Sequence, residues 1–136
     1  MPEMRVTFPG GKKVDVEFGG FTVPTDQSPK NGGAGSAPDP FGYFLASLAA
    51  CAGVYVLGFC QNRSIPLEGI SLTQRVERDN GGERLLKKIS VEITLPESFP
   101  EKYRSAVVKA AEGCAIKRVI DHPPEFNIYT TTGSSG

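Results

Sequence analysis

One uncharged stretch dominates this chain. From Phe41 to Cys60 there is no charged residue and no Asn or Gln. The stretch reads as one long helix, in which Asp39 is the N-cap and Pro40 takes the first helical position, where a missing N–H costs nothing. Because the helix is hydrophobic all round, we expect neighbouring structure to cover it on all sides. In its middle lies a thiol, Cys51.

A stretch of this length is also long enough to span a bilayer. Three glycines and a serine dilute its hydrophobicity, and the rest of the chain has the amphipathic pattern of a soluble protein. The sequence therefore favours the buried core helix of a dimer and no membrane. Small residues recur on one side of this helix at helical spacing, which leaves room for a second copy of the same helix: Gly42, Ala46, Ala49 and Gly53.

Composition limits the class of protein. A chain of 136 residues is most simply a single domain, 1–136. The 15 basic and 15 acidic residues are spread along the chain, so no basic patch indicates nucleic acid as a partner. The first residues lack the pattern of a secretory signal, and three cysteines make an odd number. A reducing, cytoplasmic location fits these features best.

The N-terminal third predicts strands and then a loop. Residues 5–8 and 14–18 form two strands around a Gly-rich turn, and residues 21–23 form a third. Residues 24–38, rich in Gly, Pro, Ser and Asn, form a long loop, and loops of this length tend to be functional or linking.

After the long helix, the chain predicts a hairpin, two helices and a closing strand. Residues 70–77 and 89–95 alternate apolar and polar around the turn at residues 79–82. A second helix starts with Ser98 as its N-cap and ends at Gly113, a short third helix covers residues 116–121, and residues 126–129 form a final strand. The predicted class is α+β, with two antiparallel β units around a long buried central helix.

The thiols are the candidates for chemistry. Cys51 and Cys60 are nine residues apart and lie on opposite faces of a helix, so they cannot pair with each other. Cys114 precedes a short helix, where free N–H groups favour a thiolate. The residues alone leave two interpretations of Cys51 open, a reactive thiol or a small buried hydrophobe.

Other kinds of site are poorly supported. The sequence has no C-x-x-C motif, and its single histidine, His122, stands beside two prolines. No Gly-rich segment has the context of a nucleotide-binding loop. We therefore predict no metal and no cofactor.

Six short sequence segments, taken in order along the chain, match the pattern of a known protein family. They are Thr25-Asp26, Asn31-Gly32-Gly33, Ser36-Ala37-Pro38-Asp39-Pro40, Leu45-Ala46-Ser47-Leu48-Ala49-Ala50-Cys51, Ala110-Ala111-Glu112-Gly113-Cys114-Ala115-Ile116-Lys117 and Phe126-Asn127-Ile128. In this order the chain resembles the OsmC/Ohr family of osmotically inducible and organic-hydroperoxide-resistance proteins. Its Asp26 and Gly32-Gly33 are most similar to the OsmC-like subgroup.

The resemblance implies a fold and an activity. The OsmC-like fold would be an intertwined homodimer whose sheets are built from both chains. The activity would be that of a thiol-dependent peroxidase of the oxidative stress response. Cys51 would be the peroxidatic thiol and Cys114 the resolving thiol, with an organic hydroperoxide as substrate and a dithiol as reductant. Phe41, Phe44 and Tyr55 are candidates for an apolar substrate-binding lining.

The chain departs from the family at the residues that activate the thiol. Active peroxidases of the family carry a Glu near the start of the long helix, which orders an Arg from the N-terminal region. Here Phe41 takes the position of the Glu, and Arg5 is the only arginine before the helix. The sequence therefore leaves an alternative function open, in which a non-catalytic dimer binds a small apolar or sulfur-containing ligand near Cys51.

Overall fold

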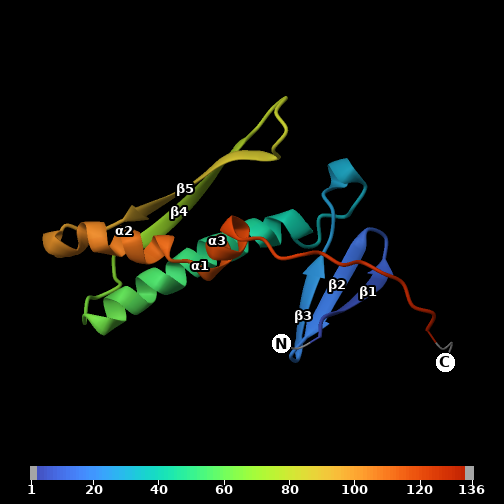
Figure 1. Cartoon of the computed structure of the whole chain (residues 1–136), viewed down its shortest axis with the longest axis horizontal. Coiled ribbons are helices and arrows are strands. Elements are labelled where there is room, and N and C mark those ends of the chain that lie inside the picture. Colours follow the sequence, from blue (N-terminus) through green and yellow to red (C-terminus); the bar gives the residue numbers. More distant parts are fainter. Residues whose placement is uncertain (1–2, 134–136) are drawn as a thin grey trace. The chain divides into compact units, whose positions relative to one another are not determined.

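A computed structural model describes residues 3–133, and these form a mixed α/β fold (Figure 1). It contains three α-helices and two antiparallel sheets. The chain divides into two compact units. The first unit runs up to Ala50 and includes Leu72–Glu92, and the second comprises Cys51–Ser71 and the chain from Ile93 onward. That the whole chain is a single domain stays a prediction.

The first unit opens with a three-stranded antiparallel sheet. Its strands β1 (Arg5–Gly10), β2 (Lys13–Phe18) and β3 (Phe21–Thr25) lie in chain order. Val16 pairs with Val6 on one side and Val23 on the other, so the apolar residues of all three strands share one face. Gly19 and Gly20 join β2 to β3 with φ of 55° and 81°, which glycine adopts without the steric cost of a side chain. The three predicted strands are confirmed.

The loop after β3 folds around a buried carboxylate. Asp26 is only 1% exposed, and it accepts hydrogen bonds from the N–H of Gln27 at 2.7 Å and from the N–H and hydroxyl of Ser36 at 3.1 and 2.6 Å. These bonds hold the pKa of Asp26 at about 2, below its ordinary value of 3.8; the hydroxyl of Ser36 has the largest effect. The N–H of Asp26 donates to the Pro38 carbonyl at 3.2 Å, so the two ends of the loop meet.

The long helix is α1 (Pro40–Asn62), and Figure 1 shows it as one unbroken helix. The side chain of Asp39 accepts a hydrogen bond from the N–H of Gly42 at 2.8 Å, as expected of an N-cap. Among the described residues, α1 is the one helix long and apolar enough to cross a membrane, a test that core helices of soluble proteins also pass.

The expectation that α1 is buried on all sides is not met within one chain. Only 28% of its most apolar window is buried, and its fully covered residues are Ala52, Val56, Phe59 and Cys60. Along the exposed face, Ala46, Ala50 and Val54 follow one another at four-residue spacing, and Val54 is 62% exposed. One chain supplies cover for one face of the helix only.

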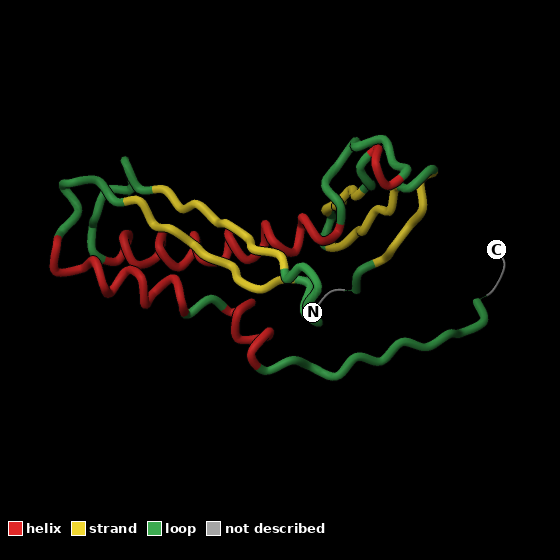
Figure 2. Tube along the Cα trace, turned by 90° about the horizontal axis from the view of Figure 1, so that it is seen from above, coloured by secondary structure: helices red, strands yellow, loops and turns green. Residues whose placement is uncertain are grey.

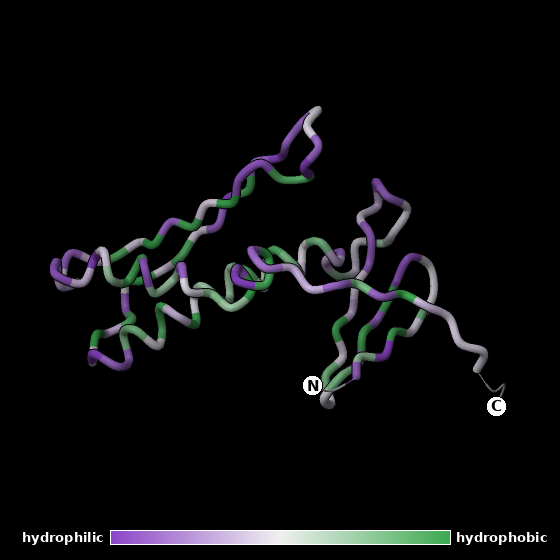
Figure 3. Tube along the Cα trace, in the orientation of Figure 1, coloured by the Kyte–Doolittle hydropathy of each residue, from purple (hydrophilic) through white to green (hydrophobic). Residues whose placement is uncertain are grey.

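The predicted hairpin is confirmed. Strands β4 (Ser71–Arg78) and β5 (Leu86–Thr94) form a two-stranded sheet, closed by a turn in which the N–H of Gly82 donates to the Asp79 carbonyl at 3.0 Å. Apolar and polar residues alternate along both strands in Figure 3. Within the first unit, the amide nitrogen of Gln74 on β4 donates to the Leu45 carbonyl of α1 at 2.9 Å.

In the second unit, α2 (Arg104–Glu112) packs on the C-terminal half of α1 (Figures 1 and 2). The ring of Tyr103, just before α2, meets Phe59 edge-on at 5.8 Å, and Val107 is fully buried. The predicted start of this helix at Ser98 is wrong: a 3-10 turn, Glu101–Tyr103, precedes α2. The proline at position 100 has no N–H to donate, and it lies outside the helix. Helix α3 (Ala115–Asp121) follows as predicted.

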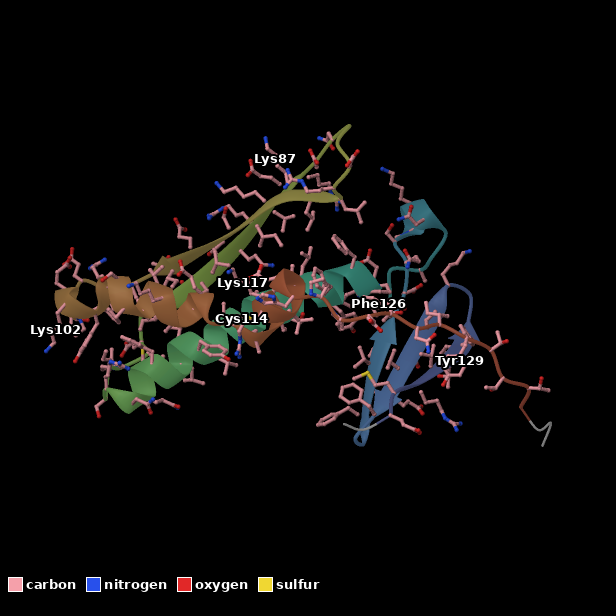
Figure 4. The ribbon with its side chains drawn as sticks, viewed as in Figure 1. Lys87, Lys102, Cys114, Lys117, Phe126 and Tyr129 are labelled. Atoms are coloured by element: carbon pink, nitrogen blue, oxygen red, sulfur yellow. The ribbon has the colours of Figure 1, made fainter. Side chains whose placement is uncertain are left out.

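The predicted strand at residues 126–129 is also wrong for the single chain. The segment is extended in Figure 2 but pairs with no other strand of the described residues. Phe126 and Tyr129, labelled in Figure 4, are 86% and 75% exposed. The segment has the alternation of a strand, and it finds no edge to join within its own unit.

Candidate active site

The second unit brings two of the three cysteines together. Cys51 lies near the middle of α1 and is half-buried, whereas Cys114 lies between α2 and α3 and is 4% exposed. Gly113 ends α2, so the chain turns at Cys114 and then begins α3 (Figure 4 labels Cys114). The thiol of Cys114 lies near enough to Cys51 to lower the pKa of Cys51, although the two residues are 63 positions apart in the sequence.

The surroundings of Cys51 favour its thiolate. The neighbouring thiol of Cys114, a potential hydrogen-bond donor to the sulfur, makes the largest contribution and lowers the pKa of Cys51. The backbone N–H groups of Ile116 and Ala115 act in the same direction, and so does the positive charge of Arg118. Partial burial acts against them, but the net effect is a lowered pKa. A thiolate at this position can attack an electrophile.

Arg118 is the residue of this cluster that the sequence analysis missed. It lies on α3, one helical turn after Cys114, and its N–H donates to the Cys114 carbonyl at 3.2 Å. The signal in the sequence was a cation four residues after the second cysteine. That spacing places the two side chains on the same helix face once the chain after Cys114 is helical.

Tyr55 is the one predicted lining residue in the same unit as both thiols. It lies one helical turn after Cys51 on α1 and is partly exposed. Its ring lies beside Gly113, where a Cβ atom would approach it at 3.9 Å. The ring therefore lies beside the turn that carries Cys114.

The other predicted site residues lie in the first unit. Phe41 and Phe44 are in the first turns of α1, where their rings stack at 5.9 Å. Arg5 lies on β1 beside Glu17 of β2, and both line an open pocket at one end of the sheet. The roles of these three residues stay predictions.

The remaining thiol differs from Cys51 in its surroundings. Cys60 is fully buried, and burial raises the pKa of its thiol, although nearby Arg63 acts in the opposite direction. Cys60 is therefore less reactive than Cys51. His122 is exposed at the end of α3, where its N–H donates to the Arg118 carbonyl at 3.0 Å. Within residues 3–133, no group of three or more His, Cys, Asp or Glu side chains could hold a metal ion.

Comparison with known proteins places the chain in a family. Residues 33–129 match the family model described as OsmC-like protein. This range includes both Cys51 and Cys114. No curated protein matches the chain in sequence.

Solved structures with the same fold include stress-response proteins. One, described as an osmotic stress induced and detoxification response protein of Psychrobacter arcticus, has a TM-score of 0.70 and 21% identity, with 90% of each chain covered. The organic hydroperoxide resistance protein OsmC of Legionella pneumophila has a TM-score of 0.60 and 23% identity, with 88% of each chain covered.

A third structure contains a small molecule. It is described as an organic hydroperoxide resistance protein of Vibrio cholerae with captopril bound in one of its active sites. Its TM-score is 0.51 and its identity 18%, with 86% of this chain and 83% of that chain covered. At such identities these likenesses establish the fold alone.

Proposed function

The chain belongs to the OsmC-like protein family, and from this premise we propose that it is a thiol-dependent peroxidase that reduces organic hydroperoxides. Membership of the family supports a redox or stress-related role. The observation that carries the finer proposal is the pairing of Cys51 with Cys114 in surroundings that favour a thiolate. The three free thiols fit a reducing compartment, and we propose that the protein acts in the cytoplasm.

In the first step, the thiolate of Cys51 attacks the terminal oxygen of a hydroperoxide, R–O–OH. A sulfur–oxygen bond forms and the O–O bond breaks. The sulfur is oxidised to a sulfenic acid, Cys51–SOH, and the alkoxide takes up one proton and leaves as the alcohol R–OH. The exposed part of Cys51 gives the peroxide access to the sulfur.

In the second step, the thiol of Cys114 condenses with the sulfenic acid. The S–S bond forms, the S–O bond breaks, and the departing hydroxyl leaves as water with the proton of Cys114. An external dithiol then reduces the disulfide by two thiol–disulfide exchanges and is itself oxidised to a disulfide. The position of Cys114 near Cys51 suits it to this role.

Turnover of cumene hydroperoxide with dithiothreitol tests the proposal. Cys51→Ser removes the nucleophile, so we expect a loss of turnover of at least about 100-fold. Cys60→Ser is the matched control, because Cys60 is buried away from solvent, and it should retain most of the turnover. Equal and negligible consumption by wild type and Cys51→Ser would rule the peroxidase out.

We also propose that the protein works as a homodimer in which the exposed face of α1 packs against a second copy. The support is the uncovered apolar face of α1, where the backbone at Gly53 and Gly58 is open to close approach. Val54→Arg places a charge on this face, and we expect it to convert the dimer to monomers in light-scattering measurements. A wild-type chain that is monomeric at micromolar concentration would contradict the dimer.

One observation favours the alternative, a dimer that binds a small apolar or sulfur-containing ligand near Cys51 without turnover. Phe41 stands where active peroxidases of the family carry a Glu. Native mass spectrometry of the purified protein distinguishes the two. A retained small molecule together with absent turnover would favour the binding protein, and a ligand-free mass with turnover would favour the peroxidase.

A further inference from the structure

An arginine directly after α1 makes two contacts with the last turns of that helix. The guanidinium of Arg63 donates a hydrogen bond to the Phe59 carbonyl at 3.1 Å. The same group lies over the Phe59 ring, with its Cζ atom 3.7 Å from the ring centroid. Among residues 3–133, Arg63 forms no ion pair with a carboxylate. Its guanidinium is therefore oriented by the end of α1, where a cation also suits the helix dipole.

The arginine also reaches the residue that precedes α2. The ring of Tyr103 meets Phe59 edge-on at 5.8 Å, and the Cζ atom of Arg63 is 5.5 Å from the centroid of the Tyr103 ring. Phe59 is 8% exposed, and a cation held over a ring away from water binds it more strongly. We call Phe59, Arg63 and Tyr103 the aromatic cluster. It joins the end of α1 to the start of α2 within the second unit.

The two thiols lie at the other end of the same helix pair. Tyr55, one turn after Cys51 on α1, has its ring beside Gly113, where a Cβ atom would be 3.9 Å away. Gly113 is the residue before Cys114. Because Phe59 meets the start of α2 and Tyr55 meets its end, the two helices run in opposite directions, as Figure 1 shows. The aromatic cluster and the thiols therefore hold opposite ends of α2 against α1.

A disulfide tolerates little displacement of the segments that it joins. The Cα atoms of paired cysteines are about 4.4 to 6.8 Å apart, so a slide of α2 by one helical turn, about 5.4 Å, would take the two thiols out of range. Cys51 lies on α1 itself, whereas the chain reaches Cys114 only through α2 and the turn at Gly113. The position of Cys114 thus depends on how α2 is held along α1.

We propose that Arg63 is a positioning residue for the resolving step: by joining the end of α1 to the start of α2, it holds Cys114 where it can form a disulfide with Cys51. This inference rests on the proposed function of the two thiols. It separates the two chemical steps, because the loss of Arg63 would displace Cys114 but leave Cys51 in place on its own helix. The second step should therefore slow while the first keeps its rate.

The reaction of the reduced protein with the aromatic disulfide DTNB measures the two steps separately. The thiolate of Cys51 attacks DTNB, so that a mixed disulfide forms on Cys51 and one thionitrobenzoate leaves. The thiol of Cys114 then loses its proton and attacks the sulfur of Cys51, the disulfide between the two cysteines forms, and a second thionitrobenzoate leaves. Only the first phase depends on the DTNB concentration, so stopped-flow absorbance distinguishes the phases. Peptide mass spectrometry identifies the disulfide that results.

For Arg63→Met we expect the second phase to slow about fivefold and the first phase to change by less than about twofold. Tyr103→Leu removes the other side of the same contact and should slow the second phase to a similar extent. The double variant should be no slower than either single one, because each already breaks the contact. Lys102→Met is the matched control: the Lys102 ammonium lies 5.1 Å from the centroid of the Tyr103 ring, but among residues 3–133 no hydrogen bond or ion pair joins it to α1. Both phases should then stay at the wild-type rate.

Several outcomes would overturn the inference. They are an unchanged second phase for Arg63→Met, an equal slowing of both phases, an equal effect of Lys102→Met, or a wild-type protein that shows no second phase. Circular dichroism of each variant checks that the fold is retained. Because DTNB takes the place of the peroxide, a slowed second phase supports Arg63 even if the wild-type protein fails to turn over hydroperoxide, and the two proposals fail separately.

Discussion

The two units of the chain bury different kinds of residue. In the second unit the covered residues are apolar, and they include Val56, Phe59 and Val107. In the first unit the residues described as buried are polar, Thr25 and Asp26, while Phe8 and Phe21 of its sheet are exposed. The second unit therefore has an apolar core of its own, whereas the first depends on hydrogen bonds and leaves an apolar sheet face uncovered.

Each unit also favours the anionic form of one side chain, the carboxylate of Asp26 in the first unit and the thiolate of Cys51 in the second. The carboxylate of Asp26 is enclosed by donors of its own loop, so nothing from solvent can reach it. The thiolate of Cys51 is favoured by the same kinds of donor, but its residue is partly exposed. Similar electrostatics produce a structural anchor where the anion is enclosed and a candidate nucleophile where it is accessible.

The largest expected effect is that of Gly33→Ala in the loop around Asp26. A Cβ atom at Gly33 would overlap the backbone carbonyl of Gln27, which cannot move without breaking the loop. We expect a loss of about 3 kcal/mol in the free energy of unfolding, measured by urea denaturation. In the control Gly82→Ala, the new Cβ would meet the Asp79 side chain, which can rotate away, so the loss should be smaller.

The next effect concerns pH. Because the pKa of Asp26 falls from 3.8 to about 2 on folding, the ionised carboxylate stabilises the folded chain above pH 3.8, and this stabilisation disappears as the pH falls toward 2. Asp26→Asn should therefore be less stable than wild type at pH 7 and should approach it near pH 2. Thermal unfolding between pH 7 and 2 measures the difference. If the unfolding temperatures of wild type and Asp26→Asn differ by the same amount at every pH, Asp26 is not the source of the pH dependence.

Val107→Ala tests the apolar core of the second unit. Val107 is fully buried on α2, so removing two methyl groups should lower the free energy of unfolding by about 2 kcal/mol. Val6→Ala is the matched change in the first unit. Because Val6 is 51% exposed on the sheet, it should cost about 0.5 kcal/mol or less in the monomeric chain. If both substitutions lowered the free energy of unfolding equally, the second unit would not have the better-packed apolar core.

The smallest effect separates two roles of Cys114. Cys114→Ala removes the thiol that lowers the pKa of Cys51 most, so alkylation of Cys51 at pH 7 should slow by about tenfold. Cys114→Ser keeps a donor and should preserve most of the alkylation rate, although it cannot form the disulfide. If both variants alkylate Cys51 at the wild-type rate, then Cys114 contributes nothing to the thiolate.

The sequence predicted the elements that follow from local chemistry. Asp39 and Pro40 mark the start of α1, and the glycines at residues 81 and 82 mark the hairpin turn. The strand at residues 126–129 could not be predicted correctly from its pattern, because alternation gives a segment's preference and says nothing of an available edge. The pattern of α1 likewise gives a preference for cover on all sides; one chain covers only one face, and cover of the other face by a second copy stays a prediction.

The site was predictable only in part. The two cysteines were found through the order of motifs along the chain, but spacing alone could not show that Cys114 lies beside Cys51. That proximity depends on how α2 packs on α1 and where Gly113 ends it. Arg118 was missed because its relevance depends on α3 being helical and on the orientation of that turn toward α1.

The burial of Cys60 has a consequence for oxidation products. Three thiols can pair within one chain in three ways, and a protein exposed to oxidants risks being trapped in the wrong pair. Cys60 is fully buried and its pKa is raised, so it is a poor attacker in any exchange. Two of the three pairings are thereby suppressed, which matches the proposed mechanism, in which the disulfide forms between Cys51 and Cys114.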